Sequence, residues 1–467
     1  MEGARKNGTD LNKQSLRHGI SSIADKIFAS LQKYAYADAI LTSTNYTSIS
    51  LKDGKIESAR EGQTQAMSCR MLLGGSFGFA SSNKVGDFAS IISEAAKLAK
   101  IPGGKIKICE PQANRAKILA KVRQDPSTHS YEEKIKMLTE IEKDVKIAKV
   151  SNTNLVYYDS SSKIFTLNSA GAFIEEDDVR TGAAAHIYAK ENGRIETSFE
   201  QVKAKGGFEI LGEFPQRAAK AAMEAVSLLS AKHGPAGKMS AILDPELAGV
   251  LSHEAVGHAC EADGIANYSS CLRGKMGKRI GNEVVTIKDS PVVFPNLWGS
   301  YRFDDEATKA RGTVLVDRGA LKGYLTSLET ANEYGNILTG NARGDSNCRP
   351  IVRMSNTYFE KGDAKIGELF EGVKNGVYLA GCKEGQVSPK LGNFTFAAKF
   401  GFLIKNGERA GMIKDCSING NILESLHNID MVANDLEFLP GTCGKDAQSA
   451  SVTTGSPHLR INNILVG

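Results

Sequence analysis

Apolar residues recur at helical spacing near the beginning of the chain. Within residues 20–34, Ile23, Ile27 and Leu31 follow one another at intervals of four, and residues at that spacing share one face of an α-helix. Further along the N-terminal half, residues 85–100 are amphipathic, residues 131–150 are densely charged, and residues 208–231 carry alanine along one side. The pattern therefore predicts four helices, over residues 20–34, 85–100, 131–150 and 208–231.

Alternation of apolar and polar residues, which is typical of half-buried strands, separates these helices. The Asp53-Gly54 pair is a strong signal for a tight hairpin turn. We expect helices packed on antiparallel hairpins, which makes the N-terminal half a mixed α/β unit within an α+β protein. Its predicted strands cover residues 39–51, 63–72, 75–80, 154–168 and 173–190.

Glycine and proline within residues 233–237 mark a change of pattern. Short strand-like segments dominate beyond it, and one strong helical signal lies among them. We predict a flexible tail over residues 1–17, an N-terminal domain over 18–235 and a β-rich C-terminal domain over 236–467. The predicted strands of the second domain cover residues 239–243, 283–287, 312–317, 320–327, 376–380, 395–403 and 417–423.

Composition excludes several classes of protein. The 467 residues carry a net charge of only +5 and are 24% charged, which argues against nucleic-acid binding. No apolar run approaches the roughly 20 residues that span a bilayer, and the first sixteen residues lack the apolar core of a signal peptide. The eight cysteines form no C-x-x-C pair, as expected for reduced thiols. We predict a cytoplasmic protein without a membrane segment.

The helical signal of the second domain contains His253-Glu254-Ala255-Val256-Gly257-His258. Two imidazoles can bind a metal ion while the carboxylate beside the first handles a proton, as in zinc hydrolases with an H-E-x-x-H helix. The histidines are five positions apart, which on a regular α-helix places them roughly 140° apart, instead of about 40° for a spacing of four. A π-bulge would widen the turn and bring both to one ion. Gly257 is the residue where we expect that distortion to cost least.

A stable zinc site needs a third protein ligand. Glu261 and Asp263, the remaining histidines and the cysteines are all candidates, and the local sequence does not choose among them. Glu261 and Asp263 could instead orient an imidazole of the motif from behind. The acidic run Asp304-Asp305-Glu306 is predicted to be a solvated turn.

Several blocks in order along the chain resemble the TldD/PmbA family, whose members are often described as modulators of DNA gyrase. The H-E-x-x-x-H segment is similar to the signature helix of that family, and Ala307 stands in the acidic turn where the family usually has glycine. The resemblance extends over most of residues 20–467. Its blocks are residues 253–263, 303–308, 321–325, 349–357 and 440–448.

This resemblance implies a TldD-type metallopeptidase that degrades or trims unfolded peptides, with a β-rich C-terminal domain that encloses a metal site. It implies Zn²⁺ as the cofactor and His253, His258 and Cys443 as its ligands. Because the chain keeps the complete motif, it resembles the catalytic type of subunit. The resemblance also implies a dimer, either a homodimer or a heterodimer with a degenerate paralogue.

Glu254 is the expected general base, which takes a proton from water and returns it to the leaving amine. We expect the peptide to add as a strand along an edge near residues 355–359. Arg349, Arg353 and Asn356 could anchor this peptide, or they could hold the fold together. The alternative function is a non-enzymatic module that captures peptides or regulates a partner, with a structural metal. The modest charge does not support direct action on DNA gyrase.

Overall fold

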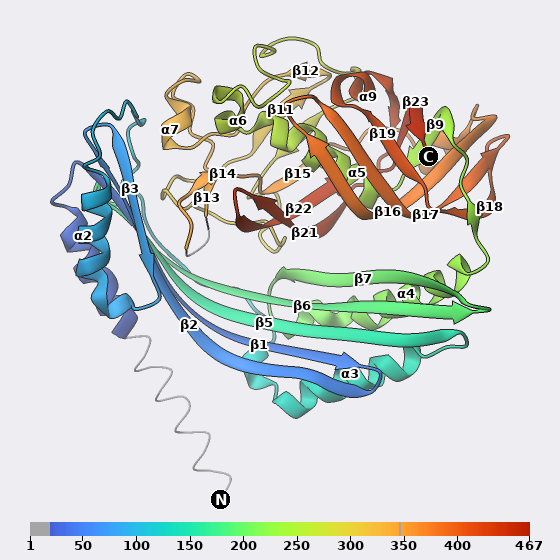
Figure 1. Ribbon diagram of the computed structural model, residues 1–467, viewed down its shortest axis with the longest axis horizontal. Coiled ribbons are helices and arrows are strands. Elements are labelled where there is room, and N and C mark those ends of the chain that lie inside the picture. Colours follow the sequence, from blue (N-terminus) through green and yellow to red (C-terminus); the bar gives the residue numbers. More distant parts are fainter. Residues whose placement is uncertain (1–18, 345–346) are drawn as a thin grey trace, which may run out of the picture.

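A long curved sheet spans the N-terminal half of the molecule (Figure 1). The computed structural model describes residues 19–344 and 347–467, so the predicted tail over residues 1–17 lies outside the described residues. The sheet has the order β3-β2-β1-β5-β6, and both β4 and β7 pair with β6. All of its pairings except β4–β6 are antiparallel. Its strands are β1 (Tyr36–Lys52), β2 (Lys55–Leu73), β3 (Ser76–Ser82), β4 (Arg115–Ile118), β5 (Val150–Asn168), β6 (Phe173–Glu191) and β7 (Arg194–Lys205).

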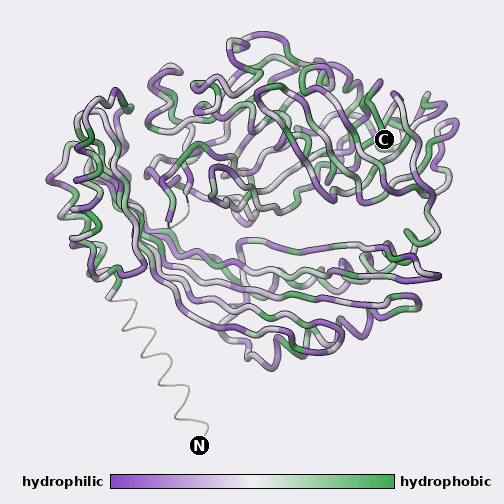
Figure 2. Tube along the Cα trace, in the orientation of Figure 1, coloured by the Kyte–Doolittle hydropathy of each residue, from purple (hydrophilic) through white to green (hydrophobic). Residues whose placement is uncertain are grey.

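The predicted hairpin between β1 and β2 is confirmed. Lys52 pairs with Lys55, and Asp53 and Gly54 both have positive φ, 50° and 79°, as a type I′ turn requires. Hydrophobic and hydrophilic stretches are interspersed along these strands (Figure 2). Strand β7 was not predicted, although Asn192-Gly193 before it turns with φ of 48° and 79° and is the same kind of hairpin signal.

The predicted helices cover the convex side and one end of the sheet. Residues 19–31 are helical and pack with α2 (Phe88–Leu98) on the β1–β3 end, whereas α3 (Tyr131–Val145) and α4 (Phe214–Leu228) pack on β5 and β6. The predicted helices were too wide at one end or both: the first ends at residue 31 instead of 34, α2 at Leu98 instead of 100 and α4 at Leu228 instead of 231. Residues 85–87 and 208–213 are 3₁₀ turns that precede α2 and α4, and α3 ends before β5 begins at Val150.

Two main sheets, of eight and six strands, build the C-terminal half, so the α+β class is confirmed. One has the order β16-β9-β23-β19-β17-β18-β8, with β20 beside β23, and an additional pairing of β16 with β17 closes five of its strands into a ring. The other has the order β12-β11-β10-β15-β22-β21. The strands are β8 (Lys232–His233), β9 (Gly237–Leu243), β10 (Ile287–Asp289), β11 (Thr313–Asp317), β12 (Ala320–Leu321), β15 (Asn356–Phe359), β16 (Asn375–Ser388), β17 (Asn393–Lys405), β18 (Glu408–Lys414), β19 (Ser417–Asn421), β20 (Ile429–Val432), β21 (Glu437–Lys445), β22 (Gln448–Ser456) and β23 (Leu459–Val466).

Short elements connect these sheets. The strand predicted over 283–287 was misplaced, since β10 begins only at residue 287, and the strand predicted over 320–327 shrinks to β12, because the chain there runs mostly as turns and loops. No described helix is long and apolar enough to cross a membrane. The connecting elements are β13 (Ala342–Arg343), β14 (Ile351–Val352), α5 (Pro245–Leu251), α6 (Ala262–Ala266), α7 (Leu328–Ala331), α8 (Ile366–Phe370) and α9 (Ile422–Asn428).

The acidic run at residues 304–306 contradicts its prediction as a solvated turn. Asp304 and Glu306 are only 2% and 1% exposed. Glu306 forms an ion pair of 2.7 Å with Arg70 of β2, and Asp304 accepts hydrogen bonds from the backbone of Glu306 and Thr308. The run is buried at the boundary of the two halves, where the Glu306–Arg70 ion pair joins the C-terminal half to the long sheet.

Helix α5 lies in the core of the C-terminal half, between β16 of one sheet and β21 and β22 of the other. Leu247, Ala248 and Leu251 are fully buried. The β21–β22 hairpin faces the long sheet (Figure 1). This arrangement places the end of α5 between the sheets, next to the boundary of the two halves.

Candidate metal centre

The segment that carries the two histidines is a widened helix. Asp244 accepts a hydrogen bond of 2.9 Å from Leu247 N–H and caps α5, and the helix then continues as a π-helix from Ser252 to Gly257. The N–H of His258 donates to the carbonyl of His253, which is the i to i+5 bond of a π turn. The predicted widening is confirmed, and it turns both imidazoles to the same side.

Gly257 is needed for a reason other than the predicted one. Its φ of −55° and ψ of −58° are ordinary for any residue. A Cβ at this position, however, would lie 1.9 Å from Sδ of Met354. The glycine therefore permits close packing of the widened turn against Met354, which belongs to the segment between β14 and β15.

The structure brings His253, His258 and Cys443 together. One ligand atom from each lies within 4.8 Å of the others, Cys443 Sγ lies 3.3 Å from His258 Nε2, and the two imidazole rings are 5.2 Å apart at 80°. His253 and Cys443 are only 3% and 6% exposed. Three donors of the predicted set thus converge on one buried point.

Cys443 is held at this point because pairing with β22 and hydrogen bonds from Arg353 fix the backbone of its strand. Strand β21 pairs with β22 over its full length, and the Arg353 guanidinium donates to the Cys443 carbonyl at 2.6 Å and to Gln448 Oε1 at 3.1 Å. Arg353 is fully buried. A hydrogen bond from a buried cation is strong, so this contact holds the backbone that presents the thiol.

A chain of charged groups supports His258 from behind. Glu261 Oε2 lies 3.0 Å from His258 Nδ1, and Lys445 Nζ lies 3.1 Å from the same carboxylate and 2.8 Å from Asp263. A carboxylate on the outer nitrogen fixes the tautomer and orientation of a metal-binding imidazole. Of the two predicted supports, Glu261 contacts the imidazole and Asp263 acts one step further away, through Lys445.

The thiol and the imidazole of this cluster polarise each other. Burial raises the pKa of Cys443, but the hydrogen bonds and charges of His253 and His258 outweigh it and lower that pKa to about 4. Burial lowers the pKa of His258, yet Glu261 and Cys443 raise it well above its ordinary value. The pair therefore favours a thiolate beside an imidazolium, and a metal ion would replace the imidazolium proton.

The donor set fits Zn²⁺. Two imidazoles and one thiolate are zinc ligands of the kind that leave a fourth position open. Nδ1 of His253 is buried without a hydrogen-bond partner among the described residues, and such a nitrogen is costly in the interior. Glu261 occupies Nδ1 of His258, so Nε2 of that ring is the atom free to bind an ion beside Cys443.

Glu254 points to solvent-accessible space next to the three donors. Its side chain is 26% exposed, and its Oε2 lies 3.8 Å from His258 Nε2. With His253 it lines a cavity of about 390 Å³ between the long sheet and the C-terminal half. The cavity walls include Phe199, Glu200 and Gln201 of β7 on one side and residues 438–442 of β21 on the other.

The remaining predicted contacts with a peptide need correction. Strand β15 lies between β10 and β22, so residues 355–359 are not an edge to which a peptide could add. Asn356 is fully buried, and its amide nitrogen donates to Ser290 O and Ser300 Oγ. Arg353 and Asn356 therefore follow the alternative prediction that they hold the fold together. Arg349 is exposed, and its carbonyl accepts a hydrogen bond from Gln448.

Two features of the site were missed in the sequence. Lys445 was not singled out, although it follows Cys443 by two residues on a strand and therefore shares its face. The wall that β7 contributes was missed because β7 itself was not predicted. Lys399 of β17 lines the same cavity and contacts β7, since its Nζ is 3.0 Å from Glu246 and donates to the carbonyl of Phe199.

Known protein families and relatives match the chain over most of its length. Models of the PmbA/TldA metallopeptidase family match residues 37–100 as domain 1, 124–229 as the central domain and 236–467 as the C-terminal domain. A protein of Methanothermobacter thermautotrophicus named metalloprotease is 37% identical over 434 residues, which cover 92% of this chain and 95% of that protein. A Saccharolobus solfataricus protein named zinc metalloprotease TldD homolog is 36% identical over 233 residues, 50% of this chain and 52% of the relative.

Solved structures show the same fold at low sequence identity. A putative modulator of DNA gyrase from Thermotoga maritima superposes with a TM-score of 0.79 at 23% identity, covering 96% of this chain and 100% of the other. TldE from Thermococcus kodakarensis superposes with a TM-score of 0.78 at 19% identity, covering 95% and 100%.

Proposed function

Because the chain belongs to the TldD/PmbA family of metallopeptidases, we propose that it is a zinc-dependent peptidase with Glu254 as its general base. The observation that carries this proposal is the convergence of His253, His258 and Cys443 beside a carboxylate that opens onto a cavity. The relatives named metalloprotease and zinc metalloprotease support it. A purely structural metal site does not require an accessible carboxylate next to its ligands.

The ligands and the base have separate tasks. His253, His258 and Cys443 would hold Zn²⁺, which when bound supplies a Lewis acid that polarises the scissile carbonyl and makes a coordinated water more acidic. Glu254 accepts a proton from the attacking water at a carboxylate oxygen and delivers it to the amine that leaves. Glu261 keeps His258 in the orientation that presents Nε2.

We propose that the outer edge of β21 holds the peptide backbone. Among the described strands, β21 pairs with β22 alone, and the carbonyl of Pro440 faces outward, where it accepts a hydrogen bond of 3.1 Å from Gln201. Because backbone direction alternates along an antiparallel strand, the polar groups of Phe438 and Thr442 face outward as well. A proline at an outward position fits an edge strand. A peptide paired here would lie next to Cys443, and pairing through backbone groups accepts many sequences.

The central experiment compares Glu254→Gln with the natural chain on an unfolded peptide, with zinc content measured in both. We expect Glu254→Gln to lose at least about a hundredfold in kcat, in line with general-base contributions, while its zinc content stays the same. A chelator should abolish hydrolysis by the natural chain. Full hydrolysis by Glu254→Gln with zinc retained would overturn the assigned base, and zinc retention without any hydrolysis by the natural chain would favour the binding module.

Substrate binding is tested at the strand edge. Thr442→Pro removes one outward N–H and should raise KM with little change in zinc content, whereas Thr442→Ala keeps the N–H and should not. A dimer is also proposed, with a second copy or with a paralogue that lacks the motif, and the resemblance to the family supports it. Sedimentation velocity checks the assembly, and a monomer in the presence of the paralogue would contradict it.

A further inference from the structure

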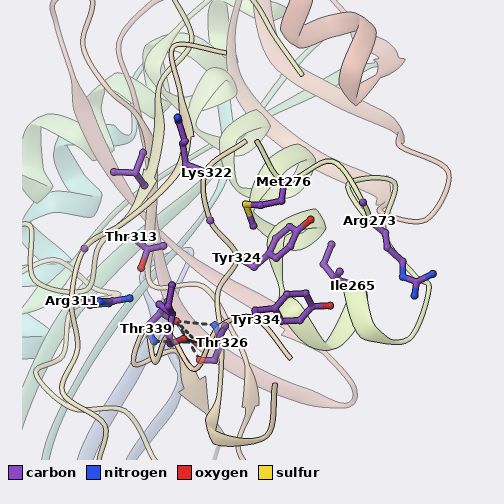
Figure 3. A pocket seen from close by; sticks show the side chains of 15 residues that line it. Ile265, Arg273, Met276, Arg311, Thr313, Lys322, Tyr324, Thr326, Tyr334 and Thr339 are labelled. Atoms are coloured by element: carbon purple, nitrogen blue, oxygen red, sulfur yellow. Dashed lines mark hydrogen bonds between the residues drawn. The ribbon is translucent and has the colours of Figure 1, made fainter. Parts of the chain in front are cut away.

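A second, larger cavity of about 1020 Å³ lies in the C-terminal half (Figure 3). It shares no lining residue with the cavity beside Glu254. Its wall is built by α6, by β11 and by residues 322–326 and 334–339. The backbone of Leu325 forms two hydrogen bonds of 2.9 Å, one with Cys260 and one with Ala262. The wall of this cavity therefore contacts the segment that directly follows His258.

The floor of this cavity is aromatic and apolar. Tyr324 and Tyr334 meet edge to face at 5.2 Å, and the hydroxyl of Tyr324 donates to the carbonyl of Leu272. Around them Met276, Val314 and Ile337 are 45%, 39% and 52% exposed. Large apolar side chains gathered at a hollow surface commonly mark a site of contact with another molecule.

The rim of the cavity is cationic and unbalanced. Arg273, Arg311 and Lys322 line it, and no aspartate or glutamate does. Within the part of the chain that the structure describes, none of these three cations has a carboxylate oxygen within the 4.0 Å of an ion pair. Arg273 stacks on Tyr268 at 3.3 Å. The rim therefore carries positive charge that could pair with an anionic ligand.

The placement of the charges indicates which anion fits. Arg273, Arg311 and Lys322 lie on different sides of the cavity (Figure 3), whereas a single phosphate group needs cations that converge. A ligand with several separated carboxylates suits this rim, and apolar side chains between them suit the floor. Thr313 adds a buried hydroxyl without a partner among the described residues, which can bond to a polar group of the ligand's backbone.

We propose that this cavity binds an acidic peptide segment in an extended conformation, with alternate side chains directed to the apolar floor and to the cationic rim. In an extended chain successive side chains point to opposite sides, so alternating glutamate and leucine match the two surfaces. Binding here does not require hydrolysis, and the proposal stands independently of the peptidase function.

The experiment measures fluorescence anisotropy of a short fluorescein-labelled peptide of alternating glutamate and leucine, titrated with the full chain. Mass spectrometry afterwards verifies that the peptide is intact. Arg311→Glu/Lys322→Glu should weaken binding at least about tenfold, and Ile337→Ser should weaken it separately. Added salt should also weaken binding, because exposed charges are screened. The matched control Lys55→Glu/Lys143→Glu changes the net charge equally at exposed positions of β2 and α3 and should bind as the natural chain does.

Four results would overturn the proposal. One is equal affinity for the peptide in which glutamine replaces every glutamate, and another is equal affinity of the charge-reversed variant and its control. Competition by inorganic phosphate at concentrations where chloride has no effect would identify a phosphate site instead. Self-association that Arg311→Glu/Lys322→Glu abolishes, without any binding of the peptide, would identify a contact between copies of this chain.

Discussion

At the scale of single residues, Cys443 differs in its charge from the buried Cys260 and the partly buried Cys382. Burial raises the pKa of Cys260 far above its ordinary value and that of Cys382 to about 12. Cys443 is buried as well, but two imidazoles face it and lower its pKa to about 4. Only this thiol is therefore ionised at neutral pH among these three, and ionisation is what a metal ligand or a nucleophile needs.

Alkylation of the metal-free protein should reveal this difference. The rate depends on the fraction of thiolate, so Cys443 should react at a rate that is nearly constant above about pH 5, one unit above its pKa of about 4. An ordinary thiol would gain roughly tenfold per pH unit up to its pKa near 8.5. Mass spectrometry of the labelled peptide gives the rate. A steep rise between neutral and alkaline pH would contradict the imidazole–thiolate pair, and added zinc should protect Cys443.

Glu261 should contribute to metal affinity without touching the metal. Glu261→Gln keeps the shape of the side chain but weakens its bond to His258 Nδ1 and removes the charge that Lys445 neutralises. We expect zinc affinity to fall by about 10- to 100-fold, the usual effect of such supports, as measured by competition with a chelator. Glu246→Gln is the control, because its carboxylate pairs with Lys399 and contacts neither histidine. Unchanged affinity in Glu261→Gln would show that packing alone orients His258.

At the scale of elements, the motif predicted a widened turn and the structure has one. The spacing of His253 and His258 was sufficient for this inference, because helical geometry is local. The role of Gly257 was not deducible, since Met354 lies about a hundred positions further along the chain. The edge strand was also misplaced, because residues 355–359 gain neighbours on both sides only after β10 and β22 assemble.

Gly257→Ala tests the packing of the widened turn. The new methyl group would lie 1.9 Å from Met354 Sδ, so either the turn or the methionine must move. We expect the free energy of unfolding to fall by about 1–3 kcal/mol, as in overpacked cores, and zinc occupancy to fall with it. Gly257→Ala/Met354→Ala should recover zinc occupancy relative to Gly257→Ala. If Met354→Ala gave no recovery, the backbone freedom of glycine would be the requirement after all.

At the scale of the whole molecule, a buried charge cluster joins the two halves. Arg70 of β2 lies 2.5 Å from Asp38 and 2.7 Å from Glu306, and all three side chains are at most 4% exposed. Ala307 follows with a φ of 59°, which glycine adopts more readily. The cluster positions the long sheet that forms one wall of the cavity beside Glu254.

Arg70→Met should therefore destabilise the whole protein. It leaves Asp38 and Glu306 buried without their cation, and the loss of one partner of a buried pair typically costs about 3–5 kcal/mol. Urea unfolding followed by circular dichroism measures the effect. Lys52→Met is the control, because the Lys52–Glu57 pair is about half exposed and such pairs contribute little. Similar midpoints for the two variants would show that the cluster does not join the halves energetically.

The sequence by itself determined the α+β class, most of the long strands, the β1–β2 turn, the π widening and, through family resemblance, all three converging residues. These follow from local periodicity, turn chemistry and the spacing of one motif. The tertiary structure decided the rest. It brought Cys443 to His258, 185 positions away, and to His253, buried the acidic run at residues 304–306, placed Arg353 under the strand that carries the thiol and left β21 at a sheet edge. Each of these depends on contacts between segments far apart in the chain, and no local pattern of hydrophobic and polar residues records which segments will meet.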